Sequence, residues 1–209
     1  QVASRGILAV RSAPVHLRAA PIYSRTGSAG IGQLPRLPDT SDEVLGIAGA
    51  LSPDLQRSVF MQASANEGQV KAMALDNARI LVFATHGLVP GDLDGLTEPA
   101  LALTTPVITG GRDDGLLTMG EILALKLDAD WVVLSACNTA SGQGEGAEAL
   151  SGLGRAFFYA GTRALLATGW PVETSSATEL TTALFRHYAE NGFTALADAL
   201  RQTQLSLIA

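Results

Sequence analysis

The chain has 209 residues and a mass of 21.6 kDa, which is the size of one α/β domain. Apolar residues make up 47% of the sequence and charged residues 16%, so a sizeable core is available and global disorder is excluded. Twenty acidic residues against fourteen basic residues give a formal net charge of −6, which argues against a nucleic-acid partner. Cys137 is the only cysteine, so an internal disulfide and the zinc-finger spacings are excluded.

The longest apolar stretches are far shorter than the roughly 20 residues of a membrane-spanning helix, so we expect no membrane partner. We therefore expect a cytoplasmic protein. The sequence begins at Gln1 rather than at Met, so we also expect it to be a piece of a longer protein.

Residues 1–38 contain five arginines, four prolines and no acidic residue. Ile7–Val10 predicts a strand, and most of residues 12–38 predicts extended or loop structure. We interpret residues 1–38 as a strand and loop segment of a domain that begins upstream, and residues 39–209 as the core. The arginine-rich segment fits either a solvated loop or a basic arm that contacts an acidic partner.

The remaining elements follow from hydrophobic periodicity and helix-capping signals. Glu43 lies near the position of a capping-box carboxylate for the first helix, and Ser64 or Asn66 opens the second. The predicted helices cover residues 40–51, 64–74, 118–125, 149–160, 174–190 and 194–207, and the predicted strands cover residues 58–61, 80–84, 131–136 and 163–168.

Strands that alternate with helices in this way predict a mostly parallel sheet with helices on both faces, which is a three-layer α/β fold. Residues 88–117 are rich in Gly, Asp, Pro and Thr and predict a hairpin excursion from that sheet. Four aspartates there fit ordinary turns better than a cation site, so we predict no metal.

Two chemically reactive residues, His86 and Cys137, each follow directly after a predicted buried strand. Both are therefore expected at the carboxyl edge of the sheet, where ligands and reacting groups collect in open α/β folds. A thiol with its ordinary pKa of about 8.5 needs a neighbouring imidazole to become a good nucleophile. Gly87 is expected to allow a sharp turn and to leave its N–H free for an oxyanion. A small buried cysteine and a structural histidine are the alternative interpretation.

The segments around these residues resemble the CHAT domain, a caspase-like module often found beside TPR repeats in bacterial proteins. The resemblance rests on "ILVFATHG" (80–87) and "DDGLLTMGEILALKLDADWVVLSACNTASG" (113–142). It is extended by "LPRLPDTSDEVLGIAGAL" (34–51) and "LSGLGRAFFYAGTRALLATGWPV" (150–172), and it covers about residues 33–209.

This resemblance implies a caspase-like three-layer sandwich and a cysteine endopeptidase without a cofactor. It implies that Cys137 is the nucleophile, that His86 is the general base, and that the backbone N–H groups of Gly87 and Cys137 hold the oxyanion. It also implies a bacterial protein with a polypeptide substrate, and an upstream TPR-repeat region or a regulatory protein as a partner.

The substrate pocket is less defined. In several members of the broader group an Asp two residues before the nucleophile binds Arg or Lys, but this chain has Ser135 there. Trp170 either borders the pocket or caps the core, and Glu173 is either a substrate contact or a first-turn carboxylate of the next helix. Residues 142–146 fit a flexible loop better than a phosphate-binding loop, because Glu145 would repel phosphate.

Two other functions remain open. A catalytically silent interaction module would keep the fold and present the sheet edge or residues 1–38 to a partner. A nucleotide-binding domain would rest on fold analogy alone.

Overall fold

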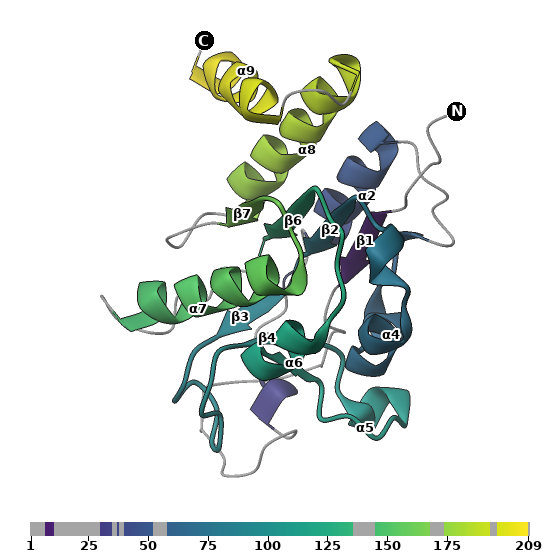
Figure 1. The fold of residues 1–209 in the computed structure, drawn as a ribbon, viewed down its shortest axis with the longest axis vertical. Helices are drawn as coiled ribbons and strands as arrows, with labels where there is room; N and C mark the ends of the chain where they lie inside the picture. The colour runs from purple at the N-terminus through teal and green to yellow at the C-terminus, as the bar shows by residue number, and fades with distance from the viewer. Residues whose placement is uncertain are drawn as a thin grey trace.

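A parallel sheet lies at the centre of the fold, with helices on both of its faces (Figure 1). The computed structural model describes residues 7–10, 30–34, 37, 40–51, 58–135, 145–167, 174–192 and 196–208. Within these residues the sheet has four strands in the order β1-β2-β6-β7, and every neighbouring pair is parallel. They are β1 (Ile7–Val10), β2 (Ile80–Phe83), β6 (Trp131–Leu134) and β7 (Leu165–Ala167).

Alternate side chains of β2 and β6 enter two different hydrophobic clusters, because successive residues of a strand point to opposite faces. Leu81, Phe83, Val132 and Leu134 belong to the cluster covered by α4 (Glu67–Ala72), α6 (Met119–Ala124) and α7 (Glu145–Ala160). Ile80, Val82 and Val133 belong to the cluster covered by α2 (Thr40–Leu51), α8 (Thr174–Glu190) and α9 (Leu196–Ile208). The predicted three-layer arrangement is confirmed.

A second, antiparallel sheet follows β2 and confirms the predicted excursion. In the described residues it has the order β3-β4-β5. Its strands are β3 (His86–Leu88), β4 (Ala100–Ala102) and β5 (Leu116–Thr118). Further short helices of the described residues are η1 (Gln62–Ser64), η2 (Leu75–Asn77) and α5 (Pro106–Thr109).

The helix-capping predictions hold for α4 and α6. The side chain of Asn66 accepts a hydrogen bond from the Gln69 N–H at the start of α4. Thr118 caps α6 in a capping box with Glu121. Both caps satisfy backbone N–H groups that have no partner within the helix.

Several predicted boundaries are wrong. Residues 58–61 form no strand, since Ser58 is helical and only Val59 makes an isolated β-bridge. Helix α4 ends at Ala72, before the predicted residue 74. Helix α7 starts at residue 145, earlier than predicted, whereas β7 is shorter than residues 163–168 and its side chains are half-buried or exposed.

The predicted strand Ile7–Val10 is confirmed, and it joins the central sheet through β2. Most of residues 12–38 lie outside the described part of the chain. None of the helices in the described residues is long and apolar enough to cross a bilayer.

Candidate functional site

The pairing of β2 with β6 positions the start of the candidate site. Phe83 at the end of β2 is in register with Leu134 at the end of β6. Neighbouring strands lie about 4.8 Å apart. His86 follows Phe83 by three residues, and Cys137 follows Leu134 by three residues. The two segments that lead to these residues therefore leave the same edge of the sheet from adjacent positions.

Three of the predicted site residues, Cys137, Trp170 and Glu173, lie outside the described residues, as does most of the loop 142–146. His86, Gly87 and Ser135 are described. The structure brings His86 and Ser135 to the carboxyl ends of adjacent strands, β2 and β6.

His86 is the first residue of β3 and is opposite Ala102 of β4. The hydroxyl of the preceding residue, Thr85, donates a hydrogen bond to the Ala102 carbonyl. Thr85 is fully buried and His86 is 6% exposed. The backbone that carries the imidazole is thus fixed by the second sheet and by a buried hydrogen bond.

Gly87 is the central residue of β3, opposite Leu101. It is not among the described glycines with positive φ. The sharp turn expected at this glycine is therefore wrong: the chain continues as an extended strand, because the antiparallel sheet begins already at His86.

Ser135 is the first residue after β6, and its hydroxyl donates a 2.8 Å hydrogen bond to Glu43 Oε2 of α2. Thr181 Oγ1 of α8 lies 2.8 Å from the other carboxylate oxygen, Glu43 Oε1. Three segments far apart in the sequence thus meet at one carboxyl group. Glu43 lies within the core, and each of its carboxylate oxygens contacts a hydroxyl group from another element.

Glu43 is fully buried, and burial raises the pKa of its carboxyl above the ordinary value. Sequence reasoning missed this group, although a signal was present. Glu43, Val44, Ile47 and Ala48 follow helical spacing and are all buried, so Glu43 lies on the apolar face of α2.

A second polar cluster surrounds Lys71 of α4. The Lys71 ammonium donates hydrogen bonds to Glu67 and to Glu121 Oε1, the latter at 2.6 Å. Glu67 Oε2 also accepts a 3.0 Å hydrogen bond from the buried Gly115 N–H. Burial raises the pKa of Glu67 to about 7, while the Lys71 and Thr118 donors hold the pKa of Glu121 below its ordinary value.

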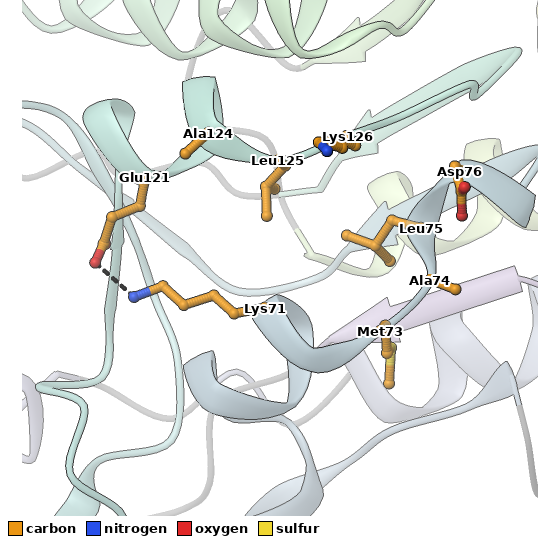
Figure 2. A pocket seen from close by; sticks show the side chains of 9 residues that line it. All are labelled: Lys71, Met73, Ala74, Leu75, Asp76, Glu121, Ala124, Leu125 and Lys126. Carbon is orange, nitrogen blue, oxygen red and sulfur yellow. Dashed lines mark hydrogen bonds and ion pairs between the residues drawn. The ribbon is translucent and has the colours of Figure 1, made fainter.

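The bridge between Lys71 and Glu121 closes one side of an open pocket of about 600 Å³ between α4 and α6 (Figure 2). Leu75 of η2 and Leu125 extend into the gap between these segments (Figure 2). The chain passes from these two residues into the amino ends of β2 and β6. The pocket therefore lies at the edge of the sheet opposite to His86.

Two of the four aspartates of residues 88–117 accept backbone hydrogen bonds, and a third, Asp113, lies 3.9 Å from the Lys71 ammonium. Asp92 accepts a hydrogen bond from the Val89 N–H, and Asp114 accepts one from the Leu116 N–H, both at 2.8 Å. The described residues contain no group of three or more His, Cys, Asp or Glu side chains arranged to hold a metal ion.

A mostly parallel sheet between two helical layers, with a histidine directly past the end of a central strand, defines a caspase-like α/β sandwich. The chain belongs to the CHAT domain family, whose family model matches residues 3–209. The family model therefore begins about 30 residues before the range 33–209 over which the sequence motifs resemble the family. CHAT is a caspase-like family whose members are often peptidases and often occur with TPR regions. A search of curated proteins finds no match to the chain.

Proposed function

We propose that this chain is a cysteine endopeptidase that hydrolyses peptide bonds with Cys137 and His86, as the peptidase module of a larger regulated protein. One observation carries the proposal. Phe83 and Leu134 are paired on adjacent parallel strands, and His86 and Cys137 follow them at equal distances along the chain. The match to the CHAT family supports the same assignment.

In the proposed mechanism, a ring nitrogen of His86 takes the thiol proton of Cys137, and the thiolate attacks the scissile carbonyl carbon. The backbone N–H groups of Gly87 and Cys137 hold the oxyanion that forms. His86 then gives its proton to the leaving amine, and a thioester results. A water molecule, activated by His86, hydrolyses the thioester and restores the thiol.

The substrate pocket in this proposal is bordered by Ser135, Trp170 and Glu173. Because residue 135 is serine and its hydroxyl bonds to Glu43, this position supplies no acidic group for a basic substrate side chain. We further propose a cytoplasmic, bacterial setting in which residues 39–209 form the catalytic core and an upstream TPR region or a regulatory protein controls access to it.

The first test is the alkylation rate of Cys137 between pH 5 and 9 in the wild type and in His86→Ala. An assembled dyad gives fast alkylation at acidic pH in the wild type, because the imidazole stabilises the thiolate, and slow alkylation in the variant. Cys137→Ala should abolish cleavage of a peptide library while the melting temperature changes by only a few degrees. Unchanged cleavage by Cys137→Ala would contradict the proposal.

The low exposure of His86, at 6%, favours a second candidate, a caspase-like interaction module that is catalytically silent. This module predicts a Cys137 thiol that iodoacetamide does not modify at neutral pH, and a partner that is lost when residues 1–38 are deleted. Rapid alkylation of Cys137 would count against it.

A further inference from the structure

The carboxyl group of Glu43 connects three elements at the edge of the sheet that leads to Cys137. It belongs to α2, and its hydrogen-bond partners are Ser135 at the end of β6 and Thr181 on α8. Glu43 and Thr181 are buried. The carboxyl group is therefore part of the joint between the helical layer and the central strands.

The surroundings of Glu43 disfavour a negative charge. No Lys, Arg or His of the described part of the chain forms an ion pair with this carboxyl group. A buried carboxylate without a cation is costly, so the group tends to keep its proton. The raised pKa of Glu43, which results from burial, agrees with this.

A protonated Glu43 would also supply this cluster with one further hydrogen-bond donor. In the structure the Ser135 hydroxyl donates to Oε2 and the Thr181 hydroxyl donates to Oε1, each over 2.8 Å, and Thr181 Oγ1 also lies 2.9 Å from the Ala177 carbonyl and 3.3 Å from the Thr178 carbonyl. With an ionised Glu43, the single hydroxyl hydrogen of Thr181 would have to serve both Oε1 and the Ala177 carbonyl.

We propose that Glu43 is a positioning residue that acts through Ser135 on the segment carrying Cys137; this inference rests on the proposed peptidase function. Ser135 precedes Cys137 by two residues, and two residues span at most about 7 Å of extended chain. In this proposal the bond from Ser135 to Glu43, a residue that Thr181 of α8 also contacts, restricts where the thiol can lie relative to His86, whose backbone β3 and Thr85 fix independently. A displacement of about 1 Å in such an arrangement can cost about 100-fold in rate.

Three substitutions separate this role from general packing. Glu43→Gln keeps the shape of the neutral group, with an amide N–H for Thr181 and a carbonyl oxygen for Ser135, and should retain kcat within about threefold. Glu43→Leu keeps the approximate volume without hydrogen bonds and should lower kcat by about 100-fold with little change in KM. Ser135→Ala removes one donor and should lower kcat in the same direction.

The matched control is Ile47→Val, which removes one methyl group from the same buried face of α2 and touches none of the hydrogen bonds. It should lower stability slightly and leave kcat unchanged. All variants are assayed well below their melting temperatures. If Glu43→Leu does not fold, the alkylation rate of Cys137 in Ser135→Ala decides, because this readout does not depend on the proposed place of Ser135 at the border of the substrate pocket.

Alkylation of Cys137 at a fixed pH supplies a readout that needs no turnover. Slower alkylation in Glu43→Leu and Ser135→Ala, with rescue in Glu43→Gln, supports the inference. Equal alkylation rates in the wild type and in folded Ser135→Ala overturn it, as does a loss in Glu43→Gln as large as in Glu43→Leu. Failure of the proposed peptidase function would give a different result. The wild-type protein would then cleave no peptide, whether or not the alkylation rate of Cys137 differs between the wild type and the variants.

Discussion

At the scale of single residues, Gly161 shows how close approach and backbone conformation together select glycine. It lies at the turn between α7 and β7 with φ of +115°, a conformation that residues with side chains rarely adopt. A Cβ atom there would overlap the backbone carbonyl of Leu127. The same carbonyl belongs to the residue whose N–H bonds to Ala160, so it cannot move freely.

Gly161→Ala is therefore expected to destabilise the protein by at least about 1–3 kcal/mol, the cost of the strained backbone alone. Chemical denaturation measures the loss. Gly49→Ala is the control, because Gly49 lies in α2 with no atom within 4 Å of the place that the new methyl group would take, and it should gain about 0.5–1 kcal/mol from helix propensity. Equal stabilities of the two variants would contradict the argument.

Glu67 is the residue for which the structure predicts a pH dependence. Its side chain is 3% exposed, and burial raises its pKa from an ordinary value of 4.5 to about 7. Between these two values the folded protein holds a proton that the unfolded chain has released. Stability attributable to Glu67 therefore falls as the pH rises through this window and is constant above it.

Glu67→Gln removes this titration. The melting temperature of the wild type minus that of the variant should decrease between pH 5 and pH 7.5, on the order of a few degrees. Thermal melts of both proteins at several pH values provide the measurement, and other titrating groups largely cancel in the difference. A difference that rises with pH would show that the bond to Lys71 dominates instead.

At the scale of elements, an aromatic pair is one of the apolar contacts through which α7 packs on the sheet. Phe157 is fully buried, and its ring centroid lies 5.5 Å from that of Phe83 on β2. The next residue of the helix, Phe158, is 49% exposed. Phe157 and Phe158 are therefore a matched pair, because they are the same residue type on one helix and differ in how far their side chains are buried.

Phe157→Ala should cost about 3–5 kcal/mol, because it removes buried surface and leaves a cavity beside the central strand. Phe158→Ala should change the free energy of unfolding by only about 0.5 kcal/mol. Equilibrium denaturation of both variants gives the comparison. Similar losses in the two would mean that α7 packs through a different face.

Elements with strong local signals could be predicted from the sequence. Helix α6 was predictable because Thr118 and Glu121 have capping-box spacing, and β2 because an apolar run ends at Thr85. The structure of residues 58–61 could not be predicted in this way. A short apolar run can form a strand, an isolated bridge or a buried turn, and only tertiary contacts decide among them. Helix α7 begins inside a glycine-containing segment, where local propensity favours a loop.

At the scale of the whole molecule, the candidate site was predictable only in part. The position of His86 past the end of a buried strand follows from local sequence. The meeting of Glu43, Ser135 and Thr181 does not, because it depends on how α2 and α8 pack on the same face of the sheet. Periodicity assigns a residue to a helix face, but it does not identify the partner across the interface.

The pairing of β1 with β2 has a consequence for the order of folding. Ile7 is in register with Ile80, Ile80 with Trp131, and Val132 with Leu165, so the loops closed by the three strand pairs shorten toward β7. Closing a longer loop costs more chain entropy, although each doubling adds only about 0.6 kcal/mol. We expect β6 and β7 to associate first and the N-terminal strand to join an already assembled sheet last.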